Sequence, residues 1–352
     1  MTDNRIPVAI LGATGNVGQR FIQLLQDHPW FRVAELVASE RSAGKKYEDA
    51  TVWRLGADMP EGVRNLTVLD YNAELQSPLA FSGLPSEVAE EIEGRLAASG
   101  IAVVSNTATH RMEPDVPLII PEVNADHLAA IKTQQVNRGW KGFITTNSNC
   151  SVMHLALTLK PLQDVFGLKS VLVTTLQAVS GAGYPGVPSL DMIDNVVPFI
   201  GSEEEKMETE AMKMLGTYTS AGFQNADFVL SAHCNRVPVR DGHTECASVS
   251  LGREVSPEEV IAAFEAFRGL PQEYGLPSAP KRPIVVRREE NRPQPQLDRD
   301  TERGMASVVG RVRPCPVLGI KYVLLGHNTI RGAAGAGILN AELLKEQGLL
   351  NI

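Results

Sequence analysis

The sequence predicts an α/β protein with two sheets. Short apolar runs alternate with helical stretches up to residue 149, which is typical of a parallel sheet with helices on both faces. Beyond that residue, long strand-like runs follow one another with few helices between them, which favours a mostly antiparallel sheet. A glycine-rich turn closes the first apolar run. We therefore expect a Rossmann-type parallel-sheet domain followed by an α+β domain, and 352 residues agree with about two domains.

The first domain is expected to span 1–149. An apolar run at 6–11 leads into the turn, helix-spaced apolar residues continue to Pro29, and a second run at 33–38 completes a strand–helix–strand unit. Further strand-like and helical runs then alternate. The strands are expected at 79–81, 101–104, 118–120 and 143–146, and the helices at 88–98 and 125–131.

The second domain is expected to span 150–327 and to open with a helix at 150–165 that has one apolar side. Its strands are expected at 170–179, 228–239, 244–251, 305–312 and 321–325. The polar, proline-broken segment 287–303 is expected to form a long surface loop or an arm that reaches a neighbouring subunit. A helix at 331–346 is expected to return segment 328–352 to the first domain.

Composition excludes several classes of function. The formal net charge is -8, with 33 basic and 41 acidic residues interspersed, so we expect no nucleic-acid surface and only a local phosphate site. The sequence holds neither a run of 18 apolar residues nor a signal-like start, so we expect no membrane partner and a cytoplasmic location. Four widely spaced cysteines in such a chain favour reduced thiols over disulfides.

Gly12, Gly15 and Gly18 lie where a predicted strand meets a predicted helix. Glycine there allows a sharp turn and brings helix N-terminal amides close to a pyrophosphate. The spacing is G-x-x-G-x-x-G rather than the standard G-x-G-x-x-G, so a purely structural turn is the alternative. We favour a dinucleotide site.

The identity of the dinucleotide depends on the end of the second strand. Arg41, with Ser39 and Ser42 close by, can neutralise and hydrogen-bond a 2′-phosphate, which favours NADP over NAD. Glu40 is contrary evidence, because an acidic residue here binds the ribose hydroxyls of NAD. The alternative for Arg41 is a solvated loop charge.

Cys150 is the candidate nucleophile. It follows the strand at 143–146 and falls in the first turn of the predicted helix, where free amides and the helix dipole favour a thiolate. We therefore expect its pKa to be lowered. The other cysteines lie in strand-like runs or beside prolines, where an inert thiol is usual.

A thiolate that attacks a carbonyl needs a partner for proton transfer. His154 lies one helical turn after Cys150, and His243 begins a predicted strand just after a turn, so the residues alone leave both open. A zinc site built from His233, Cys234, His243 and Cys246 is a weaker alternative, because adjacent residues on a strand point to opposite faces. We expect no metal.

Several charged residues have two interpretations. Glu203 and Lys206 are three apart at a predicted helix start, and an acid-rich helix start stabilised by the dipole is the simpler one. Arg111 and Arg236 are ordinary surface arginines unless a site uses them.

Together these motifs resemble the aspartate-semialdehyde dehydrogenase family over essentially the whole chain. The resemblance is carried, in order, by GATGNVG at 12–18, ASERSAG at 38–44, SNCS at 148–151, QAVSGAG at 177–183, EEEK at 203–206, Arg236 seven residues before His243, and NTIRGAA at 328–334. Segment 292–300, RPQPQLDRD, resembles the branch found in archaea, fungi and some bacteria. Thr301, Glu302 and Arg303 depart from the smaller residues expected before Gly304.

The resemblance implies a role for each matching position. Cys150 forms the acyl thioester, His243 rather than His154 handles the protons, and Gln177 orients the reacting group. Substrate and phosphate are bound by Arg111, Asn149, Glu203, Lys206 and Arg236, with Arg236 on the carboxylate, Glu203 on the amino group, and Lys206 and Arg111 on phosphate. NADP is bound by Gly12, Thr14, Gly15, Asn16, Val17, Ser39, Arg41, Ser42, Ser180, Gly181 and Asn328.

The implied reaction is the NADPH-dependent reductive dephosphorylation of 4-phospho-L-aspartate to L-aspartate 4-semialdehyde, which serves lysine, threonine, methionine and diaminopimelate biosynthesis. The family implies a homodimer or homotetramer, with inorganic phosphate as a small-molecule partner. The rivals are N-acetylglutamyl-phosphate reductase and malonyl-CoA reductase, whose substrates have no ammonium to pair with Glu203. An NADP-binding regulatory protein without activity would not need Cys150, Gln177 and His243 in these motifs.

Overall fold

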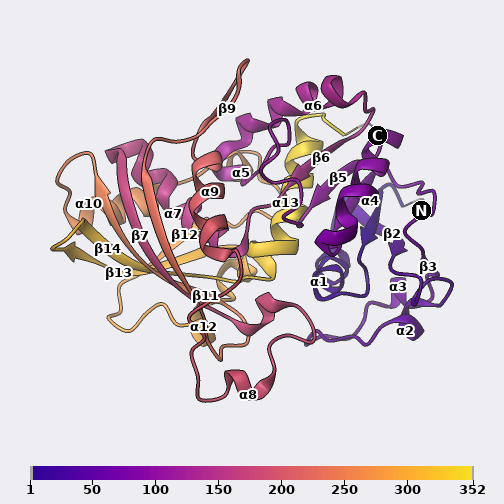
Figure 1. Ribbon diagram of the computed structural model, residues 1–352, viewed down its shortest axis with the longest axis horizontal. Coiled ribbons are helices and arrows are strands. Elements are labelled where there is room, and N and C mark those ends of the chain that lie inside the picture. The colour runs from indigo at the N-terminus through magenta and orange to yellow at the C-terminus, as the bar shows by residue number, and fades with distance from the viewer. Residues whose placement is uncertain (1–2, 351–352) are drawn as a thin grey trace.

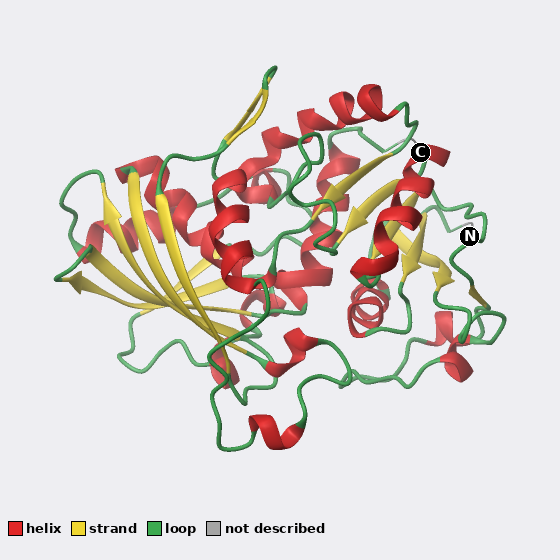
Figure 2. Cartoon of the chain, in the orientation of Figure 1, coloured by secondary structure: helices red, strands yellow, loops and turns green. Residues whose placement is uncertain are grey.

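The computed structural model describes residues 3–350 and contains two six-stranded sheets. Figure 1 shows the first sheet on the right, near both termini, and the second on the left. Figure 2 shows that helices cover the first sheet on both sides and that the second sheet is a long, curved layer. The chain therefore has the two layered units that the sequence predicts.

The first sheet is entirely parallel and has the strand order β3-β2-β1-β4-β5-β6. This doubly wound order, which reverses between β1 and β4, confirms the predicted Rossmann-type sheet. The predicted strand at 118–120 is reduced to a single bridge between Leu118 and Thr146. The strands are β1 (Ile6–Leu11), β2 (Phe31–Val37), β3 (Val68–Leu69), β4 (Leu79–Ser82), β5 (Ala102–Ser105) and β6 (Phe143–Thr146).

Alternate residues of β1 enter two different cores. Val8 and Ile10 belong to the cluster that contains Phe21 of α1 (Asn16–Leu25), whereas Ala9 and Leu11 belong to the cluster on α4 (Ser86–Ser99). A strand buried on both faces must be apolar throughout, which is why β1 shows no polar alternation. Helix α13 (Gly335–Glu346) joins the α1 core through Ile338, Leu339, Leu343 and Leu344.

The second sheet has the order β10-β7-β11-β14-β13-β12. Three of its strand pairs are antiparallel, but β10 pairs with β7, and β12 with β13, in parallel, so the sheet is mixed. The strands are β7 (Leu168–Gln177), β10 (Val229–Arg236), β11 (His243–Leu251), β12 (Ile284–Arg287), β13 (Ser307–Cys315) and β14 (Gly319–Gly326).

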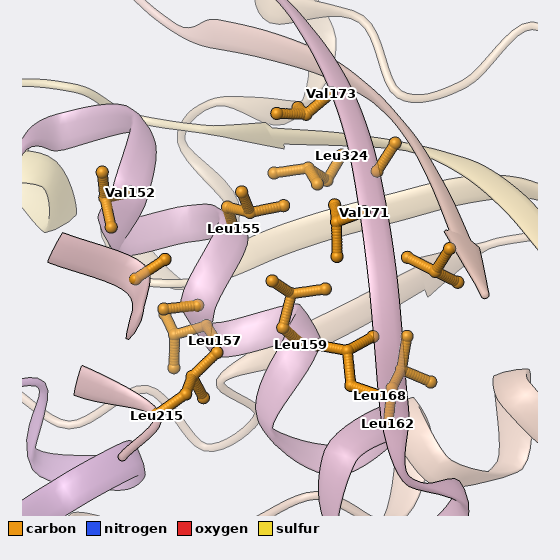
Figure 3. Packing of buried hydrophobic residues seen from close by; sticks show 14 of the residues in the cluster. Val152, Leu155, Leu157, Leu159, Leu162, Leu168, Val171, Val173, Leu215 and Leu324 are labelled. Atoms are coloured by element: carbon orange, nitrogen blue, oxygen red, sulfur yellow. The ribbon is translucent and has the colours of Figure 1, made fainter. Parts of the chain in front are cut away.

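Helix α7 (Cys150–Phe166) fills the core against this sheet. Figure 3 shows Leu155, Leu159 and Leu162 pointing toward Val171 of β7, with Leu324 of β14 nearby. Each such aliphatic side chain contributes about 1.5–3 kcal/mol by its burial. The helix begins at Cys150 because the Asn149 side chain accepts hydrogen bonds from the Ser151 and Val152 amides. This packing fixes the direction of α7 and so the place of its first residue.

The expected loop at 287–303 is ordered within this chain. It contains the short helix α12 (Pro295–Asp298), and the buried Asp298 carboxylate accepts from the Arg287 and Arg292 side chains and from the Gln294 amide. The loop therefore folds around one carboxylate.

The remaining helices, strands and turns lie between or around these two sheets. They are α2 (Tyr47–Ala50), α3 (Glu61–Arg64), α5 (Pro121–Asn124), α6 (Ala130–Arg138), α8 (Ser189–Met192), α9 (Glu203–Met214), α10 (Pro257–Ala266), α11 (Leu270–Glu273), β8 (Thr217–Thr219) and β9 (Gly222–Gln224), with 3₁₀ turns at Ala125–Ala129, Val179–Ala182 and Thr301–Gly304 and a π turn at Ile330–Ala334. Within residues 3–350, no helix combines the length and the apolar character that crossing a membrane requires.

Candidate active site

A cavity of about 590 Å³ lies where the two units meet. Its walls come from the first turn of α1, the loops after β4 and β5, the starts of α7 and α9, and the 3₁₀ turn at Val179–Ala182. The loops after β1 and β4 flank the point where strand order reverses, which is the usual place of ligands in such sheets.

The glycine turn at 12–18 closes this cavity on the first-domain side. Gly12 has a φ of +73°, and a Cβ there would lie 2.6 Å from the Gly83 carbonyl oxygen. A Cβ on Gly18 would lie 2.3 Å from the Gly12 carbonyl oxygen. Both positions therefore require glycine. Gly15 is the N-cap of α1, and Asn16 and Val17 line the cavity, so the free amides of the helix start lie at its wall.

Gln19 is a residue of this turn that sequence reasoning missed. Its buried amide donates to the Thr14 carbonyl oxygen at 3.1 Å and to the Val52 carbonyl oxygen at 3.0 Å, and it accepts from the Arg54 amide at 2.9 Å. These contacts hold the glycine turn in place, whereas the short pattern of glycines gives no sign of them.

Ser39, Arg41 and Ser42 form a turn directly after β2, outside the residues that line the cavity. The Ser42 amide donates to the Ser39 carbonyl oxygen at 2.8 Å, and Arg41 is exposed. Lys45, which the sequence reasoning did not single out, donates from Nζ to the Arg41 carbonyl oxygen at 2.8 Å. Two cations therefore lie in this turn, while Glu40 is exposed.

Cys150 and His243 are in direct contact, with 3.1 Å between Sγ and Nε2. The Ala178 backbone N–H donates to His243 Nδ1 at 3.0 Å. Because that nitrogen accepts, the single proton of the neutral imidazole is on Nε2 and points at the sulfur. His154 is fully buried and contacts Ser307 Oγ at 2.8 Å through Nδ1. Of the two histidines, His243 is therefore the one that the fold brings to the thiol.

The electrostatic environment differs from the sequence-based expectation. Burial, reinforced by the Glu203 carboxylate, raises the pKa of the Cys150 thiol to about 12, while Arg111 and Arg236 oppose that rise. The expected lowering of this pKa by the helix start is therefore wrong for the ligand-free site. Burial and the nearby Arg236 hold the pKa of His243 well below its usual value. The resting pair is a thiol beside a neutral imidazole.

Glu203, at the start of α9, is the centre of a hydrogen-bond cluster. Its carboxylate accepts from Asn149 Nδ2 at 2.8 and 2.9 Å, from Gln177 Nε2 at 3.2 Å, and from Lys206 Nζ at 3.2 Å. Gln177 also donates to Ser151 Oγ. The solvated helix start considered as the simpler interpretation is wrong for Glu203, which is buried and lines the cavity.

Arg111 and Arg236 are buried, so neither is an ordinary surface arginine. Arg236 donates from Nη1 to the Ala178 carbonyl oxygen at 2.8 Å. Arg111 is paired with Glu210 at 2.9 Å and donates to the Asn106 carbonyl oxygen at 2.8 Å. With Lys206 they place three cations around the cavity, which suits an anionic ligand.

Ser180, Gly181 and Asn328 form another part of the wall. Asn328 Nδ2 donates to Ser180 Oγ at 2.8 Å, and Asn328 Oδ1 accepts from the Gly242 amide at 2.9 Å. Gly332 lies against the nucleophile, because a Cβ there would lie 2.8 Å from Cys150 Cβ. The segments 177–183 and 328–334 therefore meet beside Cys150.

Glu210 and Lys213 are further residues that the sequence reasoning missed. Together with Glu203 and Lys206 they follow at intervals of three, four and three residues, which places all four on one face of α9. That spacing could have indicated them, since a helix face rich in buried charge is unusual.

The zinc alternative finds no support in the geometry. His233 is exposed while Cys234 is buried, and Cys246 is exposed while His243 is buried. Across residues 3–350, no group of three or more His, Cys, Asp or Glu side chains is arranged to hold a metal ion.

Comparison with known proteins identifies the family of the chain. Residues 7–131 match the family model described as the semialdehyde dehydrogenase NAD binding domain, and residues 159–331 match the semialdehyde dehydrogenase dimerisation domain. The aspartate-semialdehyde dehydrogenase of Methanothermobacter thermautotrophicus is 54% identical, with 97% of this chain and 99% of that protein covered. The chain belongs to the aspartate-semialdehyde dehydrogenase family.

Other members of the aspartate-semialdehyde dehydrogenase family agree with this assignment. The Schizosaccharomyces pombe protein is 49% identical over 97% of this chain and 99% of its own length. The crystal structure of the Candida albicans enzyme with NADP has a TM-score of 0.90 at 43% identity, covering 98% of this chain and 99% of that one. Archaeal and fungal members are thus among its relatives, as the segment at 292–300 predicts.

Proposed function

We propose that this protein reduces 4-phospho-L-aspartate to L-aspartate 4-semialdehyde with NADPH, releasing inorganic phosphate. The observation that carries the proposal is the 3.1 Å contact between Cys150 Sγ and His243 Nε2 in a cavity with three cations and one central carboxylate. An acyl phosphate that also has a carboxylate and an ammonium needs this combination of charges.

The charged residues of the cavity bind different groups of the substrate. Arg236 binds its carboxylate through two N–H groups, Glu203 binds its ammonium, and Lys206 and Arg111 bind its phosphoryl oxygens. The ammonium takes the place of the Lys206 contact to Glu203, which frees Lys206 for the phosphoryl group.

The covalent steps use Cys150 and His243. The Cys150 thiol gives its proton to an oxygen of the phosphoryl group, and its sulfur attacks the acyl carbon. The C–O bond to phosphate then breaks, the phosphate leaves with the bonding pair and the proton, and a thioester remains. Gln177 and the Cys150 backbone N–H hold the carbonyl group and stabilise its negative oxygen, since the next two amides of α7 already donate to Asn149. Bound NADPH supplies the hydride that reduces the thioester. The C–S bond then breaks, and His243 Nε2–H donates to the departing sulfur.

The cofactor fits the glycine turn. Thr14 to Val17 cradle the pyrophosphate at the α1 start, where Gly12 and Gly18 leave no space for a side chain. Ser39, Arg41 and Ser42 bind the 2′-phosphate, and Ser180, Gly181 and Asn328 hold the nicotinamide end. The Candida albicans relative, whose fold matches closely, was crystallised with NADP.

The chain contains the dimerisation domain of its family, which supports a homodimer. Pairing of two dimers into a tetramer, a cytoplasmic location and a role in lysine, threonine and methionine biosynthesis complete the proposal. We assign residues 1–149 and 328–352 to the cofactor domain and 150–327 to the catalytic domain, because α13 shares its core with α1.

The decisive assay supplies NADP, phosphate and L-aspartate 4-semialdehyde and follows NADPH formation. We expect turnover, and we expect Cys150→Ser to lose roughly 10³-fold or more of the rate. Cys246→Ser, which changes an exposed thiol on β11, is the matched control and should keep the parent rate. A parent that is inactive here but oxidises NADPH with malonyl-CoA or N-acetylglutamyl phosphate would contradict the proposed substrate.

A further inference from the structure

Glu210 of α9 connects two parts of the cavity wall through one buried carboxylate. Its side chain is 2% exposed. Oε1 accepts from Arg111 Nη1 at 2.9 Å, and Oε2 accepts from the Asn149 backbone N–H at 2.6 Å. Asn149 is the residue that caps the helix of Cys150. One carboxylate therefore joins the loop that carries Arg111 to the start of the helix that carries the nucleophile.

Lys213, one helical turn later, also binds the loop that carries Arg111. Its Nζ donates to the carbonyl oxygens of Arg111 at 2.7 Å, Glu113 at 2.8 Å and Val116 at 2.9 Å. The loop from 111 to 116 is thus held to α9 by a carboxylate and an ammonium on adjacent turns. These contacts leave the loop little freedom to move relative to α9.

The plane of the Arg111 guanidinium is fixed as well. Nη1 is bound to Glu210 and Nη2 donates to the Asn106 carbonyl oxygen at 2.8 Å, while the side chain still lines the cavity. Arginine binds oxyanions best when its planar group is already oriented, because less rotamer freedom is lost on binding. The buried carboxylate also offsets the cost of keeping this charge out of water.

We infer that Glu210 is a positioning residue, which sets Arg111 at a fixed separation from Cys150 so that a phosphate on Arg111 lies beside the sulfur. The inference rests on the proposed function, because it takes phosphate as the anion that Arg111 binds. Glu210 itself is not among the residues that line the cavity, and both of its oxygens accept from protein donors.

The first test is Glu210→Gln. A carboxamide places an NH₂ donor where one carboxylate oxygen was, so either Arg111 or the Asn149 backbone N–H faces another donor and loses its acceptor. In the direction that consumes phosphate, we expect the KM for phosphate to rise at least about tenfold and the KM for NADP to stay within about twofold. Glu205→Gln, on the exposed side of the same helix, is the matched control and should change neither constant.

A double-mutant cycle with Arg111→Lys separates positioning from general loss of structure. If Glu210 acts through Arg111, adding Glu210→Gln to Arg111→Lys should raise the phosphate KM by less than about twofold further. Independent, multiplying effects of the two substitutions would contradict the inference. If Glu210→Gln does not fold, Glu210→Asp keeps the charge but is too short to reach both donors, and it should raise the phosphate KM by a smaller factor.

A measurement without turnover distinguishes this inference from the proposed function. Phosphate should protect Cys150 of the parent from iodoacetamide, followed at that residue by mass spectrometry, and Glu210→Gln should need at least about tenfold more phosphate for half protection. A parent that is protected but inactive contradicts the proposed function alone. An active parent whose phosphate KM is unchanged by Glu210→Gln contradicts the role of Glu210 alone, and a parent neither protected nor active contradicts both.

Discussion

The Ala178 backbone N–H donates to His243 Nδ1 at 3.0 Å, and this contact fixes which imidazole nitrogen faces the nucleophile with a proton. A backbone amide is always a donor, so Nδ1 cannot hold a proton while the contact exists. A doubly protonated ring would place two N–H groups against each other. His243 therefore begins the reaction as a hydrogen-bond donor to Cys150, and the site does not rest as a thiolate–imidazolium pair.

The pH dependence of Cys150 alkylation should reflect this resting state. Burial, with Glu203, raises the thiol pKa to about 12, so the thiolate fraction should increase with pH across the neutral range. We expect the iodoacetamide rate of the ligand-free protein to rise steadily from pH 6 to 9, by up to about tenfold per unit. A rate that is flat between pH 5 and 8 would contradict the neutral resting state, because a thiolate–imidazolium pair gives that plateau.

Glu203→Gln tests whether the Glu203 carboxylate contributes to the raised pKa of Cys150. Removing a negative charge near the sulfur lowers the thiol pKa, so alkylation at pH 8 should become several-fold faster than in the parent. Glu205→Gln, whose side chain is exposed, should leave the rate unchanged. Mass spectrometry at Cys150 is needed because Cys246 is also exposed.

The sequence predicted those parts of the site that are built by short-range structure. Gly12, Gly18 and Cys150 are recognisable because each lies where a strand passes into a helix, within a few residues of the features that reveal it. The choice between His154 and His243 was open from the residues alone, because it depends on β11 reaching α7 from 93 residues away. Ala178 acts through its backbone, which any residue except proline could supply, so no side-chain pattern indicates it.

The same distinction holds for the fold. Features set by neighbouring residues could be predicted, and features set by distant segments could not. The parallel sheet was predictable because strands and helices alternate regularly. The parallel pairing of β10 with β7 was not, because it requires α9 to act as a crossover between two strands of the second sheet. Since α9 also brings Glu203 and Lys206 to the cavity and Glu210 behind its wall, the overlooked crossover accounts for both the missed β10–β7 pairing and the missed Glu210.

Gly18→Ala tests the glycine turn. The added Cβ would lie 2.3 Å from the Gly12 carbonyl oxygen and 2.7 Å from Ala13 Cα, and backbone atoms cannot move aside cheaply. We expect a loss of about 1–3 kcal/mol in the free energy of unfolding and a smaller rise of Tm on adding NADP. Gly62→Ala, with no atom within 4 Å of its Cβ, is the control and should behave as the parent. An unchanged Tm and an unchanged NADP shift in Gly18→Ala would contradict the close approach.

Arg41→Ala tests the preference for NADP. A charge-assisted hydrogen bond to the 2′-phosphate is worth about 1.5–3 kcal/mol, so kcat/KM for NADP should fall about 10- to 150-fold. The value for NAD, which has no 2′-phosphate, should stay within about twofold. Arg288→Ala, an exposed arginine paired with Glu258 in the second domain, should change neither value. Equal efficiency of the parent with both cofactors, or an equal fall with both in Arg41→Ala, would contradict the assigned contact.

Glu245→Gln tests a buried carboxyl on β11, two residues after His243 and on the same face of the strand. Glu245 is fully buried, and neither of its oxygens has a hydrogen-bond partner within residues 3–350. Burial raises its pKa well above the usual value, so the folded protein keeps the carboxyl protonated to a higher pH than the unfolded chain, which ionises above a pH of about 4.3. The contribution of Glu245 to the free energy of unfolding is therefore fully present below that pH. It is lost as the pH rises toward the pKa of the folded state, by at most about 1.4 kcal/mol per pH unit. Glutamine has nearly the same shape and does not titrate, so the Tm of Glu245→Gln minus that of the parent should be larger at pH 8 than at pH 5. A difference that is constant or falls with pH, compared with Glu205→Gln as the exposed control, would show that Glu245 is not held neutral.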